Sequence, residues 1–289
     1  GASVKDSDGF QNVASIIQKY ANGEQCIVVV SATGKTTNAL EKVVDQKFLN
    51  VEASLNLLNK IKDAHFEIIK QLKFHDDVKL KEEVLEHFVE AEWVIEETRE
   101  MSYDYVYDQI ICIGELVSSR ILQSYLGSLN IPCEWIDSRS IIRTDDTWRE
   151  GRIQWEETND MIRKVCLPIL DKNKIIVTQG FIGSTSENNT VSLGREGSDY
   201  TAAIVSAALE VKSMTIWKDV PGVLTGDPKI FDNVTKLDRL SFLEAIEMTY
   251  YGAKVIHPKT IQPLKSKNIP LHVKSFIHPE DDGTIIFGE

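Results

Sequence analysis

Three short apolar runs constrain the fold of this chain more than any other feature. They cover residues 26–30, 174–178 and 214–217, and the first of them is apolar at every position. Runs of this kind are typical of strands that are buried on both faces of a parallel sheet. Each run ends in a polar loop, and ligands of open α/β sheets bind at the carboxyl ends of the strands. We therefore expect the loops after these runs to carry the function.

Patterns with helical spacing separate these runs. Residues 10–20 form one such pattern, and residues 51–100 are almost wholly helical in character. Strands that alternate with helices predict an α/β fold, in which helices cover both faces of a mainly parallel sheet. Further strand-like segments are expected at residues 110–113, 133–136, 271–275 and 284–287, the last of them at a sheet edge.

The composition narrows the class of protein. With 289 residues, 42% of them hydrophobic, the chain can bury one large α/β core or two lobes. A boundary between two lobes is expected between Thr185 and Leu193. The net charge of -12 leaves no evident basic face, which argues against a nucleic-acid partner. No apolar run reaches membrane-spanning length. The four cysteines are far apart, which favours a reducing cytoplasm over a disulfide framework or a metal cluster.

The loop at residues 190–201 is the strongest candidate for a ligand site. Its two glycines permit tight turns and a close approach of the backbone to a ligand. An apolar helical pattern follows, and Ser198 or Asp199 is the expected cap of that helix. The N-terminus of a helix attracts anions, and Arg195 adds a planar fork suited to a carboxylate or a phosphate. The alternative is a capped glycine-rich turn with a solvated arginine.

Two other loops offer contacts for a small ligand. Residues 34–36 resemble the end of a phosphate-binding P-loop, but that motif requires a glycine where Val29 stands, so we reject it. Thr37 remains either a substrate contact or an ordinary helix cap. Glu115 follows the strand-like run at 110–113 and opens a helix. Its carboxylate could hold an ammonium group or simply complement the helix dipole.

Residues 217–228 and 251–258 complete the set of candidates. The first segment is dense in turns and follows a strand-like run. Asp219 within it suits a ribose, a metal or a lysine, and the alternative is a structural hairpin. The second segment places Lys254 among mostly apolar residues, where it either points at phosphates or extends along the surface to solvent.

Taken together and in chain order, these segments resemble the aspartate kinases of the amino acid kinase family. The resemblance spans almost the whole chain. Glu196 stands in place of the first of two paired glycines in the family's Leu-Gly-Arg-Gly-Gly-Ser-Asp segment. The matching segments are residues 1–4, the Ser-Ala loop at 31–38, Gly-Glu-x-x-Ser at 114–118, Asp-x-Arg at 137–139, Thr-Asp at 144–145, and residues 193–199, 219–228 and 252–258.

The resemblance implies a three-layer α/β/α sandwich around a mainly parallel sheet of about eight strands. It implies one catalytic domain over residues 1–289, in which residues 1–190 bind the amino acid and residues 191–289 bind ATP. The implied reaction transfers the γ-phosphate of ATP, with Mg²⁺, to the β-carboxylate of L-aspartate. The product, 4-phospho-L-aspartate, leads to lysine, threonine and methionine. We expect a cytoplasmic enzyme that is a homodimer or a higher homo-oligomer in the full-length protein.

The same resemblance assigns roles to individual residues. Arg195 would bind the α-carboxylate of aspartate, Glu115 its ammonium group, and Thr37 would add a hydrogen bond. Ser198 would position the substrate, and Asp199 would act as a catalytic organiser of the phosphate end. No residue is assigned as a metal ligand. The nucleotide is expected at Gly1, Ser3, Ser31, Lys218, Asp219, Leu224, Lys229, Lys254 and Val255, with Lys254 also catalytic.

Some departures from the family pattern change these expectations. The family's opening lysine, its main phosphate contact, would lie upstream of Gly1, and the regulatory ACT domains of many members would lie beyond residue 289. Leu224 stands where many members have a tyrosine near adenine, and Lys229 where many have arginine. The alternatives are another amino acid kinase, acting on glutamate or N-acetylglutamate, and a non-catalytic subunit that binds nucleotide or amino acid.

Overall fold

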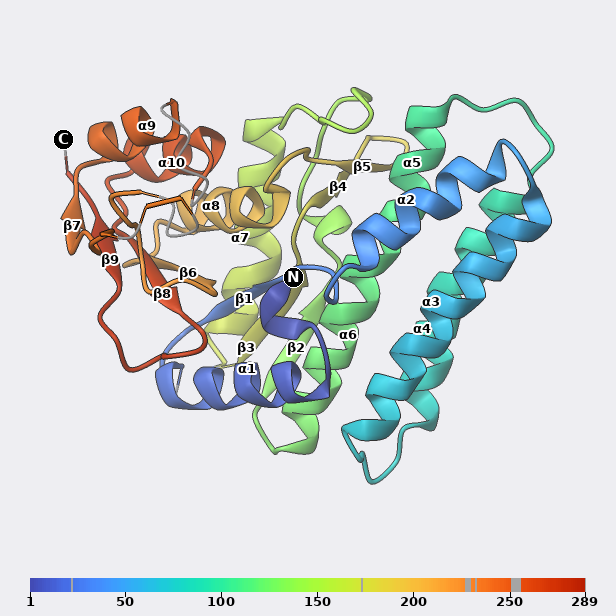
Figure 1. Ribbon diagram of the computed structural model, residues 1–289, viewed down its shortest axis with the longest axis horizontal. Helices are drawn as coiled ribbons and strands as arrows, with labels where there is room; N and C mark the ends of the chain where they lie inside the picture. Colours follow the sequence, from blue (N-terminus) through green and yellow to red (C-terminus); the bar gives the residue numbers. More distant parts are fainter. Residues whose placement is uncertain (22, 173, 227–229, 232, 251–255, 289) are drawn as a thin grey trace. The chain divides into compact units, whose positions relative to one another are not determined.

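The structure is a computed structural model that describes residues 1–21, 23–172, 174–226, 230–231, 233–250 and 256–288 (Figure 1). The chain divides into two compact units, Gly1–Gly194 and Arg195–Glu289. Each unit has its own hydrophobic core. Among the helices of the described ranges, none combines the length and the apolar character that a membrane crossing requires.

The main sheet of the first unit has three parallel strands in the order β1-β3-β2. The central strand is buried along its whole length, which explains its predominantly apolar sequence. All three strands run the same way, so their carboxyl ends lie at one edge of the sheet. The strands are β1 (Ile27–Val30), β2 (Cys133–Ile136) and β3 (Ile175–Gln179), and they confirm the strands predicted at 26–30, 133–136 and 174–178.

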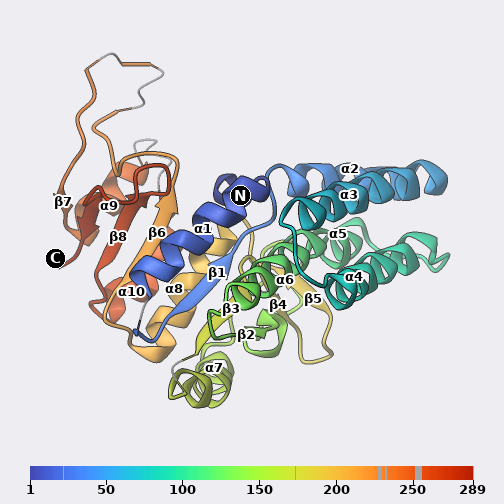
Figure 2. The same cartoon turned by 90° about the horizontal axis from the view of Figure 1, so that it is seen from below.

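Helices pack around this sheet. In the first unit α6 (Ile113–Ser128) packs against all three strands, and α7 (Trp155–Leu170) packs against β3 (Figure 2). The long helices α3 (Val51–Gln71) and α4 (Val78–Glu96) lie side by side, which confirms the helical character predicted for residues 51–100. The other helical elements are η1 (Ala2–Val4), α1 (Ser7–Tyr20), α2 (Thr36–Lys47), α5 (Tyr103–Ile111) and η2 (Ser138–Ser140).

The strand expected at residues 110–113 is wrong, because this segment joins the helices α5 and α6. Ile110, Ile111 and Ile113 are each at most 2% exposed. A helix that is covered on every side is apolar at consecutive positions, so a short piece of it has the sequence of a buried strand.

A small antiparallel hairpin follows the main sheet. Its strands are β4 (Ile182–Ser184) and β5 (Thr190–Ser192), with Ile182 opposite Ser192 and Ser184 opposite Thr190. The polar stretch between Thr185 and Leu193, where the sequence indicated a soft boundary, forms the turn and second strand of this hairpin. The two units meet in the sequence slightly later, between Gly194 and Arg195.

The sheet of the second unit has the strand order β6-β8-β9-β7. Strands β6 (Met214–Lys218) and β8 (Leu271–Ser275) are parallel and confirm the strands predicted at 214–217 and 271–275. Strand β9 (Thr284–Ile286) is antiparallel to β8. The edge position expected for residues 284–287 is wrong, because β7 (Arg239–Leu240) pairs with the outer side of β9. A strand of two residues is too short to leave a pattern in the sequence.

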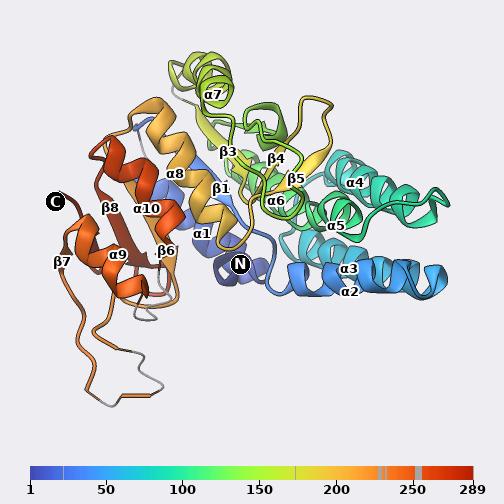
Figure 3. The same cartoon turned by 90° about the horizontal axis from the view of Figure 1, so that it is seen from above.

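Three helices complete the described part of the second unit. Of these, α8 (Gly197–Leu209) and α10 (Pro258–Ser266) pack side by side (Figure 3). The third, α9 (Phe242–Tyr250), begins with a capping box, in which Ser241 and Glu244 exchange side-chain and backbone hydrogen bonds. Both units are therefore α/β.

Candidate functional site

In the first unit, the loop after β1 is held in place by the first turns of α6. The carboxyl Oε1 of Glu115 accepts a hydrogen bond of 3.3 Å from the backbone N–H of Ala32. The hydroxyl of Ser118 donates a hydrogen bond of 2.8 Å to the carbonyl of Ser31. Glu115 and Ser118 stand one helical turn apart, so both face the same loop. The Gly-Glu-x-x-Ser segment is therefore a clamp on that loop.

Gly114 allows α6 to come this close. A Cβ atom at Gly114 would lie 2.8 Å from the Cβ of Ala32 and 3.3 Å from Cγ2 of Thr36. Both distances are shorter than ordinary carbon contacts. The glycine is therefore required by the contact between the helix and the loop.

Glu115 is the most strongly perturbed acid of this cluster. It is 3% exposed, and this burial raises its pKa to about 8, with the Ala32 N–H partly opposing the shift. Within the described residues, its second oxygen, Oε2, has no hydrogen-bond partner, and neither has the buried hydroxyl of Thr33. A buried carboxyl with one open oxygen is suited to receive a cationic donor from a ligand.

The turn at the start of the chain lies against the same loop. The carbonyl of Gly1 accepts hydrogen bonds of 3.3 Å from the N–H groups of Val4 and Gly34. The backbone nitrogen of Gly1 donates to the carbonyl of Ala32. Gly34 has a φ of +52°, a conformation that favours glycine. The start of the chain and the loop after β1 thus form one assembly.

Three other expected site residues belong to this assembly or border it. Ser3 lies in η1, Ser31 opens the loop, and Thr37 lies in the first turn of α2; all three are half-buried. The alternative reading of Thr37 as a helix cap is wrong, because the N-cap of α2 is Lys35. The first unit therefore brings Gly1, Ser31 and Glu115 together around the loop after β1. Thr37 lies just beyond this loop, in the first turn of α2.

A second clamp in the first unit was missed by sequence reasoning. Asp108 on α5 is fully buried and accepts hydrogen bonds of 2.6 Å from the Ser192 hydroxyl and 2.8 Å from the Arg149 N–H. Burial raises the pKa of Asp108 to about 6. The neighbouring Gln109 amide donates to the Thr190 carbonyl at 2.8 Å and accepts from the Thr190 N–H at 3.1 Å. The only signal in the sequence is two polar residues just before an apolar run.

In the second unit, four expected site residues gather at the N-terminus of α8. The N-cap is Glu196, so the prediction that Ser198 or Asp199 caps this helix is wrong, and both lie in its first turn. Lys218, at the end of β6, donates to Oδ2 of Asp199 at 2.7 Å. Arg195 precedes the cap and is exposed to solvent.

The remaining expected nucleotide residues are distributed as follows. Asp219 is exposed in the loop directly after β6. Leu224 is half-buried and forms an isolated antiparallel bridge with Lys236. The predicted residues Lys229, Lys254 and Val255 lie outside the described residues, so their roles stay predictions.

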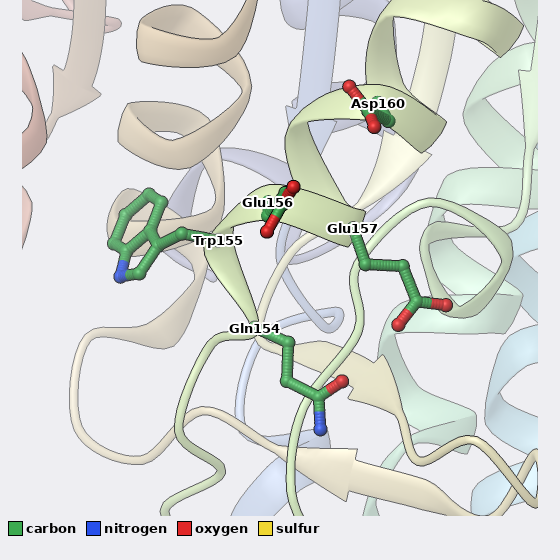
Figure 4. Close-up of a pocket in the computed structure, with 5 residues that line it drawn as sticks. All are labelled: Gln154, Trp155, Glu156, Glu157 and Asp160. Atoms are coloured by element: carbon green, nitrogen blue, oxygen red, sulfur yellow. The ribbon is translucent and has the colours of Figure 1, made fainter.

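A shallow hollow of about 480 Å³ lies at the N-terminus of α7 (Figure 4). Three of its five lining side chains are acidic, and they would repel a carboxylate or a phosphate. None of the expected site residues lines this hollow, so we assign it no ligand. It is lined by Gln154, Trp155, Glu156, Glu157 and Asp160.

The chain belongs to the amino acid kinase family, whose sequence profile matches residues 1–275. It is 32% identical over 287 residues to the lysine-sensitive aspartokinase 3 of Escherichia coli strain K12, a match that covers 99% of this chain and 62% of the relative. It is 33% identical over 294 residues to the chloroplastic aspartokinase 1 of Arabidopsis thaliana, covering 99% of this chain and 50% of that protein. The chain thus spans between half and two thirds of the length of these relatives.

Solved structures agree with this assignment. The crystal structure of E. coli aspartokinase III in complex with aspartate and ADP matches 100% of this chain and 63% of its own chain, with a TM-score of 0.88 at 31% identity. The aspartate kinase of Clostridium acetobutylicum matches all of this chain and 61% of its own, with a TM-score of 0.80 at 26% identity. The resemblance to aspartate kinases noted from the motifs is thereby confirmed, together with the α/β fold of the family.

Proposed function

We propose that this chain is the catalytic part of an aspartate kinase, which transfers the γ-phosphate of ATP to the β-carboxylate of L-aspartate. The observation that carries the proposal is the match along the whole chain to an aspartokinase solved with aspartate and ADP. The site geometry within each unit supports it. A buried acid with an open oxygen suits the ammonium group of an amino acid, and an exposed guanidinium suits its carboxylate.

The chemistry requires positioning and charge stabilisation more than proton transfer. An aspartate side chain has a pKa of about 3.9, so its carboxylate is already a nucleophile near neutral pH. Both reactants are anions, and the site must offset their repulsion. In our proposal Arg195 and Glu115 hold the two ends of the amino acid, and Thr37 and Ser198 orient it. Lys218 and Asp199, joined at 2.7 Å, organise the phosphate end.

In our proposal, each unit contributes residues that contact the nucleotide. Gly1, Ser3 and Ser31 would contact phosphates through the loop assembly of the first unit. Asp219 and Leu224 would contact the nucleoside. Lys229, Lys254 and Val255, outside the described residues, complete the proposed set.

Mg²⁺ would enter with ATP, because this ion is usually held by phosphate oxygens with only one or two carboxylates. Asp199 could be one of these carboxylates, because its bond with Lys218 engages one of its two oxygens, Oδ2. When bound, Mg²⁺ would neutralise charge on the phosphates.

The finer features of the family are part of the same proposal. We infer a three-layer arrangement around one sheet of about eight strands, with residues 1–190 serving the amino acid and residues 191–289 serving ATP. We also infer a cytoplasmic enzyme that forms a homodimer or a higher homo-oligomer. Light scattering on the full-length protein measures its oligomeric state directly.

Arg195→Ala tests the proposed substrate contact in a coupled assay of ADP release. Arg195 is exposed in the ligand-free chain, but a charge pair that bound aspartate buries costs about 2–5 kcal/mol to lose, so kcat/KM for aspartate should then fall by about 30-fold or more. The KM for ATP should stay unchanged. Arg195→Lys is the control, because it keeps the charge but not the planar fork and should recover activity only in part.

Two results would contradict the proposed reaction, and a third concerns the role of Arg195. Turnover with glutamate or N-acetylglutamate but not with aspartate would assign the chain to another amino acid kinase. Binding of aspartate and ATP without any product, in the full-length protein, would favour a non-catalytic subunit. Equal loss of affinity for both ligands in Arg195→Ala would show that the variant is misfolded or that the residue is wrongly placed.

A further inference from the structure

The backbone that leads into Arg195 is held in place by the first unit. Arg195, the proposed ligand of the aspartate α-carboxylate, follows the last residue of β5 by three positions. Leu193 lies between them, is fully buried, and donates a backbone hydrogen bond of 2.7 Å to the carbonyl of Phe181. Gly194 comes next, with a φ of +76° that favours glycine. The course of the chain is therefore defined up to the residue before Arg195.

A loop of the first unit lies directly against Gly194. A Cβ atom at Gly194 would lie 3.3 Å from the Arg149 carbonyl oxygen and 3.3 Å from Cγ of Glu150. Both distances are shorter than an ordinary carbon contact. Arg149 has a left-handed backbone, with a φ of +67°, and a residue with a Cβ atom keeps this conformation only where its surroundings support it. The position of this loop therefore depends on what holds Arg149.

Asp108 binds both segments that flank Gly194. It lies on α5, which packs against β5 (Figure 1), and its side chain is fully buried. Its Oδ1 accepts a hydrogen bond of 2.6 Å from the hydroxyl of Ser192, the last residue of β5. Its Oδ2 accepts one of 2.8 Å from the backbone N–H of Arg149. Hydrogen bonds to an ionised acceptor are stronger than neutral ones, so a single carboxylate joins the strand to the loop.

We propose that Asp108 is a positioning residue for Arg195, because it holds the backbone on both sides of Gly194 and so sets the direction in which the chain enters Arg195. The Arg195 side chain is exposed, and ordering an exposed arginine on a ligand costs entropy. A backbone that is held in advance avoids the further cost of ordering the segment that carries the arginine. The kinetic consequence rests on the proposed function, but the attachment of β5 and the loop to Asp108 does not.

The first test needs no enzymatic assay. Asp108→Asn keeps the size of the side chain, but its amide nitrogen is only a donor, so it cannot accept both hydrogen bonds. Hydrogen exchange of the Leu193 amide should become several-fold faster in this variant, because β5 loses part of its attachment. Asp104→Asn is the control on the same helix: it weakens an exposed ion pair with the Arg149 guanidinium and should leave this exchange unchanged. Unchanged exchange at Leu193 in Asp108→Asn would overturn the proposal.

An internal reference separates this local effect from a general loss of stability. The amide of Val177, in the buried strand β3, should exchange at the wild-type rate in Asp108→Asn. If Val177 is accelerated as much as Leu193, the milder variant Ser192→Ala decides, because it removes only one of the two hydrogen bonds of Asp108. Faster exchange at Leu193 alone in Ser192→Ala would support the proposal, and equal acceleration of both amides would overturn it.

The second test measures which kinetic constant changes. Asp108→Asn should raise the KM for aspartate by about 3–10-fold, because the segment that carries Arg195 must then be ordered on binding. The KM for ATP should stay unchanged, and kcat should change little. Asp104→Asn should keep wild-type values of all three constants. An unchanged KM for aspartate in Asp108→Asn, or an equal rise in both KM values, would overturn the proposal.

A double-mutant cycle shows whether Asp108 acts through Arg195. If it does, Asp108→Asn should have little further effect on kcat/KM for aspartate once Arg195→Ala is present, because the effects of coupled residues are not additive. Equal fold losses with and without Arg195 would show that Asp108 acts on the fold alone, and would overturn the proposal. If no variant phosphorylates aspartate but Asp108→Asn still accelerates exchange at Leu193, the proposed function fails and the attachment of β5 to Asp108 stands.

Discussion

Gly114→Ala tests whether the clamp of α6 on the loop after β1 has the geometry described. The added methyl carbon would lie 2.8 Å from the Cβ of Ala32 and 3.5 Å from Cδ1 of Leu40. Carbon atoms prefer a separation of about 3.5–4.0 Å, so the helix and the loop must separate by up to about 1 Å. The Cβ of Ala32 cannot rotate away, because it is fixed to the backbone. Overpacking of this kind costs about 1–3 kcal/mol.

The same displacement affects a hydrogen bond. The bond from the Ala32 N–H to Glu115 is already 3.3 Å long, and a further separation would break it. Its loss adds about 0.5–1.5 kcal/mol, which gives a total destabilisation of about 1.5–4.5 kcal/mol. Because the chain has two units, hydrogen exchange of residues 27–47 and 113–128 measures the effect better than one global transition.

Gly127→Ala, in the same helix, is the matched control. A Cβ atom at Gly127 would meet nothing within 4 Å, so alanine should leave α6 unchanged or stabilise it by up to about 1 kcal/mol. If the amides of these residues exchange as slowly in Gly114→Ala as in Gly127→Ala, the close contact at Gly114 is absent and our account of the clamp is wrong.

Three further predictions concern two buried acids of the first unit. Because the pKa of Glu115 rises to about 8 on folding, the stability of the ligand-free protein should fall as the pH rises from about 6 to 8, above the range in which Asp108 titrates. Glu115→Gln should remove this slope in denaturant titrations, and a slope that persists between these pH values would refute the assignment. Aspartate binding near pH 7 should release a proton in wild type but not in Glu115→Gln, as measured by calorimetry in buffers of different ionisation enthalpy. Asp108→Ala leaves the Ser192 hydroxyl and the Arg149 N–H without their acceptor and should cost about 1–3 kcal/mol by thermal unfolding. Asp104→Ala, which removes an exposed partner of Arg149, should cost no more than about 1 kcal/mol, and equal losses would contradict the role of Asp108.

The strands of the parallel sheet were predicted well from the sequence, because a strand that is buried on both faces is apolar at nearly every position. In β3 every side chain is buried, and the run at 174–178 shows it. The same reasoning failed at 110–113, where a helix covered on all sides has the same apolar character. Burial can be read from such a run, but the backbone conformation cannot.

Individual residues of the candidate site were predicted from the sequence, but the contacts between them were not. Glu115 and the loop after β1 were each singled out, yet the bond between Glu115 and Ala32 joins positions 83 residues apart. The cap of α8 was assigned wrongly because a left-handed glutamate has no sequence signal, whereas a glycine would have had one. Asp108 was missed because its partners come from a loop and a strand that follow it by 41 and 84 residues.

The contact between Gln109 and Thr190 has a consequence for the behaviour of the protein at high concentration. The side-chain amide of Gln109 occupies both backbone groups of Thr190, as a neighbouring strand would. An exposed strand edge with open N–H and C=O groups is a template on which other molecules can add strands and aggregate. At this position β5 is already satisfied by a side chain of its own unit, so we expect the hairpin to resist such recruitment, whereas Gln109→Ala should make it prone to assemble into fibrils.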